Sequence, residues 1–144
     1  MQNKDLNTAQ QIAQKFFSKK DTFNIKMLGE GDCNVNYLVE DSKPKIVIKL
    51  SKPYREYKAF EEYQKEKWCI KKAQRLGILV PKILDVGKYD SKAYQIQTYI
   101  EGTPVANLSV ASSLSKDSKL KVWRKLGEYT KKLTLFRQLA GAKI

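Results

Sequence analysis

Residues 28–39 read LGEGDCNVNYLV, and residues 46–50 read IVIKL. From Phe23 onward, apolar and polar residues alternate on both sides of a glycine-rich turn at 29–34, which predicts two antiparallel strands. The apolar run at 46–50 predicts a third strand, reached through a second turn at 41–44 that is rich in turn-forming residues. A three-stranded antiparallel meander is the simplest topology for this part of the chain.

The rest of the chain predicts three helices and two more strands. Apolar residues at helical spacing indicate an N-terminal amphipathic helix with Thr8 as its N-cap, and a long helix that Gly77 ends. The expected bounds are about 8–18, 55–76 and 117 onward for the helices, and about 82–89 and 94–100 for the strands. We therefore expect an α+β fold. Its parts are a five-stranded antiparallel sheet, one long inserted helix, an N-terminal helix and a C-terminal amphipathic helix.

Length and composition restrict the class of protein. The 144 residues support one domain or one lobe of a larger protein, and 42% hydrophobic residues suffice for a core. No run approaches the length of a membrane span and no signal-peptide core begins the chain, so we expect a cytoplasmic protein without membrane contact. Two widely spaced cysteines and no histidine argue against disulfides, a zinc site and imidazole base catalysis.

The chain is strongly basic, with a formal net charge of +13. Of its 28 basic residues 24 are lysines, whereas phosphate clamps and base readout favour arginine. Residues 116–144 hold nine basic and two acidic residues, but a lysine-rich helix is usually a solvated face. Nucleic acid is therefore an unlikely partner, although RNA on this basic tail stays open as an alternative.

Two charged residues lie in apolar settings and are expected to pair. The period of two in 46–50 puts Lys49 on the face of Val47, opposite the isoleucines of that strand. Glu66 follows Tyr63 by three residues and so lies on the apolar stripe of the long helix. Leaving one partner of a buried pair alone costs about 3–5 kcal/mol, which favours a Lys49–Glu66 ion pair. Glu62, one turn earlier, is the alternative partner.

Five motifs together resemble the N-terminal half of the aminoglycoside phosphotransferase and choline kinase family, which has a protein-kinase-like fold. Their order and spacing agree with that family over about residues 23–133. They are LGEGDCNVNYLV at 28–39, IVIKL at 46–50, KEKWCI at 65–70, GILVPKIL at 77–84 and IQTYIEG at 96–102. The resemblance implies the N-terminal lobe of that fold.

The resemblance also implies an ATP site. The nucleotide loop would contain Gly29, Gly31 and Asn34, Lys49 would contact the phosphates, and Glu66 would be its ion-pair partner. The Thr98 carbonyl and the Ile100 amide would form the hinge that meets adenine, with Gln97 behind them. Taken alone, Gly-x-Gly in a hairpin is most often a turn and a strand lysine is ordinary. The acidic Glu30 and Asp32 beside the loop would repel phosphate unless they point to solvent.

Phosphoryl transfer also needs a positioning aspartate and ligands for Mg²⁺, which in the family lie on a C-terminal lobe. No His-Gly-Asp-type loop is present, and after Gly102 the only acidic residues are Asp117 and Glu128. We expect residues 1–101 to form the ATP-binding lobe and 102–144 a linker and helix that begin a missing lobe. We expect no catalytic residue, no metal ligand and no turnover by this chain alone.

The last helix carries a regular apolar seam at alternating spacings of four and three. Its members are Val122, Leu126, Tyr129, Leu133, Phe136 and Ala140, and Trp123 lies next to it. In a complete kinase of this kind the seam packs against the C-terminal lobe. We therefore expect self-association, or binding to a separate catalytic lobe, through the helix at 119–140. A non-catalytic module that binds RNA or a protein partner through this basic helix is the alternative function.

Overall fold

The structure is a computed structural model that describes residues 2–19, 21–103 and 108–141. Its helices are α1 (Gln2–Phe17), α2 (Glu56–Arg75), α3 (Leu108–Ser113) and α4 (Lys116–Gly141), with a 3₁₀ turn, η1, at Pro53–Arg55. Its strands are β1 (Ile25–Glu30), β2 (Asn34–Val39), β3 (Ile46–Ser51), β4 (Ile83–Tyr89) and β5 (Lys92–Thr98). The chain divides into two compact units, Met1–Lys71 with Val80–Ile100, and Lys72–Leu79 with Glu101–Ile144.

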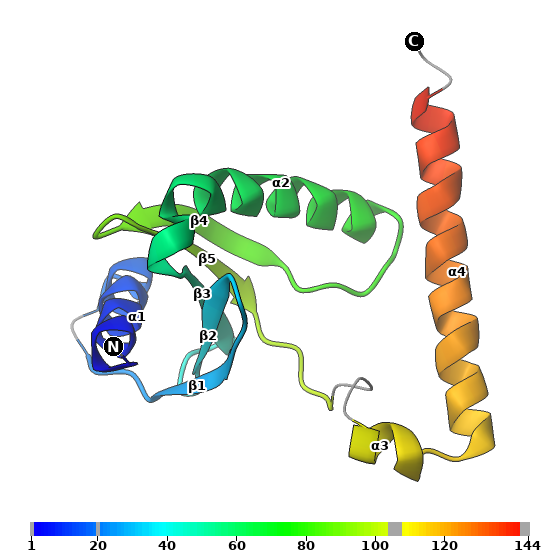
Figure 1. Cartoon of the computed structure of the whole chain (residues 1–144), viewed down its shortest axis with the longest axis horizontal. Coiled ribbons are helices and arrows are strands. Elements are labelled where there is room, and N and C mark those ends of the chain that lie inside the picture. The colour runs from blue at the N-terminus through cyan, green and yellow to red at the C-terminus, as the bar shows by residue number, and fades with distance from the viewer. Residues whose placement is uncertain (1, 20, 104–107, 142–144) are drawn as a thin grey trace. The chain divides into compact units, whose positions relative to one another are not determined.

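The first unit contains the five-stranded antiparallel sheet that the sequence predicted, in the order β1-β2-β3-β5-β4 (Figure 1). The first three strands form the expected meander. β5 then lies between β3 and β4, so that it is hydrogen-bonded on both edges. The sheet is covered on one face by α1 and on the other by the first half of α2.

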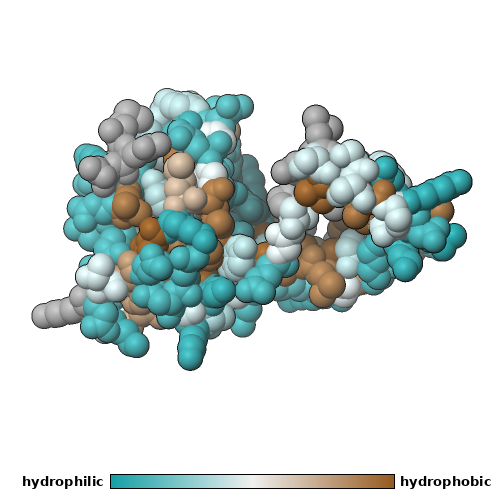
Figure 2. Space-filling view, turned by 90° about the horizontal axis from the view of Figure 1, so that it is seen from below, coloured by the Kyte–Doolittle hydropathy of each residue, from teal (hydrophilic) through white to brown (hydrophobic). Residues whose placement is uncertain are grey.

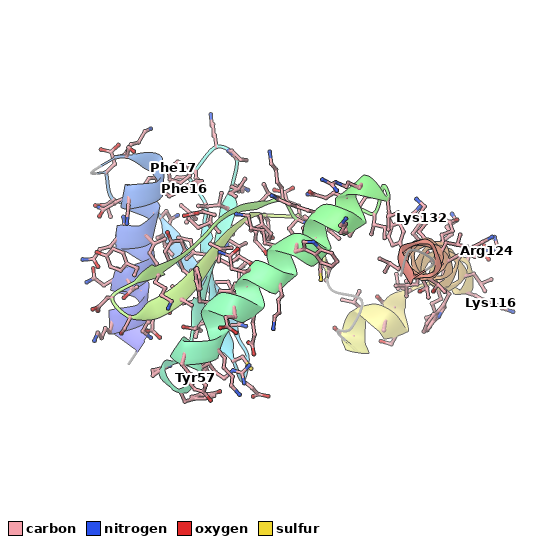
Figure 3. The ribbon with its side chains drawn as sticks, turned by 90° about the horizontal axis from the view of Figure 1, so that it is seen from above. Phe16, Phe17, Tyr57, Lys116, Arg124 and Lys132 are labelled. Carbon is pink, nitrogen blue, oxygen red and sulfur yellow. The ribbon has the colours of Figure 1, made fainter. Side chains whose placement is uncertain are left out.

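Alternation along β3 decides which side chains meet each helix. Ile46, Ile48 and Leu50 are completely buried and pack with Ile12 of α1 in the main core. Phe16 and Phe17, at the end of α1, are partly buried against this core, and their two rings meet edge to face (Figure 3). The intervening residues of β3 face α2, so a charged residue there lies between a sheet and a helix.

The N-terminal helix differs from the sequence prediction. It begins at Gln2 instead of Thr8, and the Thr8 hydroxyl donates to the Lys4 carbonyl within the helix. The extra turns are held by an ion pair of 2.8 Å between Asp5 and Lys92 at the start of β5, whose side chains are 14% and 9% exposed. Because these two residues are 87 positions apart, no local pattern predicts the contact.

The hairpin between β4 and β5 is tighter than expected. Asp90 and Ser91 both have positive φ angles, of 47° and 63°, as in a two-residue hairpin turn. β5 therefore starts at Lys92, two residues before the predicted start, and ends at Thr98.

The second unit contains α3 and α4. The short helix α3 was not predicted, whereas α4 begins within one residue of the expected Asp117. Several large apolar side chains of α4 are exposed, among them Trp123 at 70%, and brown apolar residues reach the surface on the α4 side of Figure 2. No helix within the described ranges is both long and apolar enough to span a membrane.

Candidate functional site

The first unit contains an open cleft of about 480 Å³. β1, β2, β3, β5 and α2 contribute to it, together with the segments before β4 and after β5. It is lined by Leu28, Gly29, Asn34, Asn36, Val47, Lys49, Glu66, Pro81, Gln97, Thr98, Tyr99 and Ile100. Six of the seven predicted site residues are among them, the exception being Gly31. The structure thus brings six of the predicted residues, from four separate segments of the chain, together around one cleft.

The predicted ion pair is present inside this cleft. Lys49 Nζ on β3 lies 2.8 Å from Glu66 Oε2 on α2, and the side chains are 18% and 35% exposed. The Lys49 ammonium also lies 5.1 Å from the centre of the Tyr63 ring, within the range of a cation–π contact. Glu62, the alternative partner, pairs with Arg55 instead. The ammonium of Lys49 is thus held by two contacts and lines the cleft.

Tyr63 lies on the buried face of α2, beneath this ammonium. Burial raises the pKa of Tyr63, and the nearby carboxylate of Glu66 raises it further. The phenol of Tyr63 is therefore neutral at neutral pH, and its ring face lies next to the Lys49 ammonium.

Gln95 is a site residue that the sequence analysis missed. It is completely buried on β5, and its Nε2 donates to Glu66 Oε1 and to Gln97 Oε1, each at 3.2 Å. Gln95 pairs with Lys49 in the register of β3 and β5. Alternation along the sequence of β5 puts Gln95 on one face of its strand, but only this register places it beside Lys49.

The glycine-rich turn is held by backbone hydrogen bonds. The Gly31 amide donates to the Asn34 carbonyl at 2.9 Å, and the Lys52 amide donates to the Cys33 carbonyl at 3.0 Å. A Cβ added at Gly29 would meet no atom within 4 Å, and the φ of Gly29 is not positive. The fold of this chain therefore does not require glycine there. Because glycine has no side chain, the backbone at Gly29 is uncovered where it lines the cleft.

The two acidic residues of the turn, Glu30 and Asp32, lie in different surroundings. Glu30 pairs with Lys52 at 2.7 Å, and this hydrogen bond raises the pKa of Lys52. Asp32 is exposed. The ion pair compensates the Glu30 charge and thereby reduces the repulsion of phosphate that the sequence suggested.

Hydrogen bonds on both edges fix the end of β5 and the residue that follows it. The Tyr99 amide donates to the Lys45 carbonyl at 3.0 Å, towards β3. The Thr98 amide points the other way, to the Lys82 carbonyl at 2.9 Å, and the Thr98 hydroxyl accepts from the Lys82 amide. Because the amide and carbonyl of one residue in a strand point to the same edge, the Thr98 carbonyl also faces away from β3. Ile100 follows with its side chain 55% exposed.

The described residues do not offer a ready metal site. Nowhere in ranges 2–19, 21–103 and 108–141 do three His, Cys, Asp or Glu side chains cluster as metal ligands would. Glu128, one of the two acids after Gly102, is engaged with Lys125 on α4 at 2.9 Å.

A separate surface feature lies on α4. One helix face forms a shallow groove of about 650 Å³, lined by Trp123, Leu126, Gly127, Thr130, Lys131, Thr134 and Leu135. This groove overlaps the predicted seam only in part, because Val122 and Tyr129 are half-buried in the second unit. The side chains of Phe136 and Ala140 lie outside the described residues.

Comparisons with known proteins identify the fold. No family model and no curated protein sequence matches the chain. The GDP complex of a mutant aminoglycoside 2'-phosphotransferase-IIIa has a TM-score of 0.72 at 19% identity, over 88% of this chain and 40% of that chain. The GDP and kanamycin complex of APH(2'')-IIIa has a TM-score of 0.66 at 18% identity, over 85% and 40%. Aminoglycoside phosphotransferase APH(4)-Ia has a TM-score of 0.53 at 15% identity, over 72% and 32%.

These similarities cover most of this chain but less than half of each neighbour. The chain spans about 40% of the length of the first two structures. The chain therefore has the kinase-like N-lobe fold of the aminoglycoside phosphotransferases.

Proposed function

We propose that this chain is the nucleotide-binding lobe of a small-molecule phosphotransferase. The observation that carries the proposal is the Lys49–Glu66 ion pair, which lies in one cleft with Gly29 of the glycine-rich turn and with the hinge at Thr98. An ammonium held by a carboxylate, next to exposed backbone amides, is suited to the phosphates of a nucleoside triphosphate. ATP is the nucleotide that the sequence resemblance implies.

The cleft fits such a ligand in size and in chemistry. Its volume of about 480 Å³ lies within the range of small-molecule sites, about 300–1,000 Å³. Leu28, Val47 and Pro81 supply apolar surface for a base, and Lys49 supplies the charge for phosphate. This unit provides one wall for the nucleotide, so we expect weak binding, with a Kd of about 1 mM, or about 4 kcal/mol.

Phosphoryl transfer is proposed only for a whole protein of this kind. Residues 1–101 form the nucleotide-binding lobe in this proposal, and residues 102–144 form a linker and the helix that begins the next lobe. The described residues provide no cluster for Mg²⁺, so no ligand set is assigned to this chain. A cytoplasmic location belongs to the same proposal.

The acceptor is a separate question. The neighbouring structures are described with kanamycin or hygromycin B as well as nucleotides. A small-molecule acceptor is therefore the class that fits, and the residues that select it are not assigned within this chain.

We propose that this lobe binds its partner through the exposed apolar residues of α4. Trp123, Leu126 and Leu133 are 70%, 49% and 49% exposed, and exposed apolar patches of this kind usually mark an interface. The proposed occupant is a catalytic lobe or a second copy of this chain. Light scattering at increasing concentration, with Trp123→Ser and Leu126→Ser as variants, tests association. A wild-type chain that stays monomeric up to high concentration would exclude self-association.

Nucleic-acid binding through the basic residues of α4 is the alternative function. Seen along the helix axis in Figure 3, Lys116, Arg124 and Lys132 project in different directions, and because residues eight apart differ by about 80° the three span about one half of the helix. Most of the basic residues of this helix are lysines, whereas phosphate clamps and base readout favour arginine. We therefore place this alternative second.

Lys49→Ala tests the proposed function, with Lys65→Ala as its matched control. Lys65 lies on α2 next to Glu66 but is exposed and does not line the cleft. Losing a charged contact with phosphate costs about 1.5–3 kcal/mol, so we expect Lys49→Ala to weaken nucleotide binding by about 10-fold or more. Lys65→Ala should change it little. Titration with a fluorescent ATP analogue, in competition with ATP and GTP, gives both values. Equal affinities of wild type and Lys49→Ala would refute the phosphate assignment.

A further inference from the structure

A cysteine of the glycine-rich turn lies near two hydrogen-bond donors that have no acceptor. Cys33 is exposed in the turn between β1 and β2. Its carbonyl accepts from the Lys52 amide at 3.0 Å, and the Lys52 carbonyl accepts from the Arg55 amide at 2.9 Å. Because β2 begins where β3 ends, these two hydrogen bonds bring Cys33 and η1 to the same corner of the sheet.

The first of these donors is the Nε–H group of Arg55. Arg55 Nη2 donates to Glu62 Oε1 on α2, which holds the guanidinium in place. Arg55 Nε is buried and has no hydrogen-bond partner among the described residues. The hydrogen bond with Glu62 raises the pKa of Arg55 most, and the charge of the Cys33 thiolate comes next, ahead of the charge of Glu62. The guanidinium and the sulfur of Cys33 therefore lie close together.

The second donor is the hydroxyl of Tyr63. Tyr63 is 4% exposed, and within the described ranges its Oη has no hydrogen-bond partner. Its ring contacts Lys49, but that contact leaves the hydroxyl unused. Burial raises the pKa of Tyr63 most, and the Cys33 thiolate is among the nearby charges that raise it further. Buried polar groups without a partner are uncommon in folded proteins, so two such donors near one sulfur indicate a place for an acceptor atom.

An oxygen atom on the sulfur of Cys33 would supply this acceptor. The sulfur of a thiol accepts hydrogen bonds only weakly, whereas the oxygen of a sulfenic acid accepts them as a hydroxyl does. The positive guanidinium of Arg55 also stabilises the negative charge that sulfur, oxygen and the leaving group share while a peroxide is attacked. Exposed cysteines in electropositive surroundings are the ones that react in this way.

We propose that Cys33 is a site of reversible oxidation by a hydroperoxide, to a sulfenic acid whose oxygen accepts from Arg55 Nε and Tyr63 Oη. The thiolate attacks one oxygen of hydrogen peroxide, so that an S–O bond forms as the O–O bond breaks. Sulfur is oxidised and the peroxide is reduced, and the leaving hydroxide takes up a proton to become water. A small thiol reverses the change, because it forms a mixed disulfide with loss of water and a second thiol then releases Cys33. Asn34, the next residue, lines the cleft, so the modified side chain borders it.

The test follows oxidation of both cysteines in the wild-type chain. The reduced protein is treated with a slight excess of hydrogen peroxide in the presence of dimedone, which traps sulfenic acids, and the peptides are quantified by mass spectrometry. Cys69, which is exposed on α2, is the internal reference. We expect the adduct at Cys33 to form about tenfold faster than at Cys69, the effect of one hydrogen bond from a charged donor. Equal rates at the two cysteines would overturn the inference.

Variants test the two donors. Tyr63→Phe removes the hydroxyl and keeps the ring against Lys49, and because that hydroxyl has no partner the variant should not lose thermal stability. Arg55→Met removes the guanidinium. Lys58→Met is its matched control, since Lys58 is an exposed cation one turn further along, against the Tyr57 ring. We expect Tyr63→Phe and Arg55→Met each to slow oxidation of Cys33 severalfold without changing Cys69. Lys58→Met should change neither cysteine.

The contrary outcomes are distinct from a failure of the proposed function, because no nucleotide is added. If Cys33 keeps its preference in both Tyr63→Phe and Arg55→Met, or if Lys58→Met slows it as much as Arg55→Met does, the two donors are wrong as its source. If dithiothreitol added after the peroxide, without dimedone, does not restore the Cys33 thiol, the oxidation is not reversible and the inference fails. Circular dichroism checks that each variant is folded, and the comparison of Cys33 with Cys69 needs no variant.

Discussion

Replacing Gly29 by alanine separates the fold from the proposed nucleotide site. A Cβ at this position would meet no atom within 4 Å, and its φ is not in the left-handed region. Alanine is about 0.5–1 kcal/mol more favourable than glycine inside a strand, because glycine loses more conformational freedom on folding. For a chain of 144 residues this corresponds to a rise in Tm of about 1–4 °C.

The same substitution is expected to weaken nucleotide binding. In the proposed site the backbone near Gly29 donates to phosphate oxygens, and a methyl group on this bare backbone would keep them at a distance. A lost hydrogen bond to a charged group is worth about 1.5–3 kcal/mol, which is about a 10- to 150-fold loss of affinity. Stability and affinity should therefore change in opposite directions.

Thermal denaturation and nucleotide titration of the same samples provide the measurement. Gly127→Ala is the matched control, because a Cβ there also meets nothing within 4 Å but Gly127 lies on α4, outside the nucleotide cleft. It should stabilise the helix by about 1 kcal/mol and leave nucleotide affinity unchanged. A Gly29→Ala chain that is stabilised and still binds nucleotide as wild type does would show that phosphates do not approach this backbone.

Two further predictions concern stability. Asp5→Asn leaves the buried Lys92 without its charge partner, and should lower the free energy of unfolding by about 2–4 kcal/mol in urea denaturation, whereas Asp5→Leu with Lys92→Met should restore much of it. A double variant no more stable than Asp5→Asn would contradict this account of the pair. Burial raises the pKa of Tyr37 to about 12, and burial with a hydrogen bond to Asp85 raises that of Tyr94 to about 12, from 10.0 in both cases. Since the folded state holds the phenolic proton more tightly, the contribution of these two tyrosines to stability should be constant below pH 10 and fall between pH 10 and about 12. Absorbance at about 295 nm should report phenolate formation in step with this loss, and ionisation of all tyrosines near their ordinary pKa would contradict it.

The ion pair could be predicted because both of its residues break a simple pattern. Lys49 is a charge within an apolar strand, and Glu66 is a charge within an apolar helix stripe, so each required a partner. Gln95 was missed for the opposite reason, because an uncharged residue in an apolar strand does not attract attention. Its role depends on the pairing of β5 with β3, which alternation within one strand does not specify.

The errors at the ends of elements also have physical causes. Thr8 has the chemistry of an N-cap, but α1 continues past it to Gln2, where Asp5 reaches Lys92 on a distant strand. The tertiary contact overrides the local signal. The six residues of α3 are mostly small and polar, without an apolar period that would indicate a helix.

The position of β5 in the sheet couples folding of the lobe to ligand binding in its cleft. β5 carries Gln95, Gln97 and Thr98, and it pairs with β3 across nearly 50 positions of chain, as between Ile48 and Ile96. This closure is the slow, entropically expensive step of such a topology, since local hairpins form first. A nucleotide that spans both strands would bind only the closed sheet. It should therefore act as a folding ligand and slow amide hydrogen exchange most in β3 and β5.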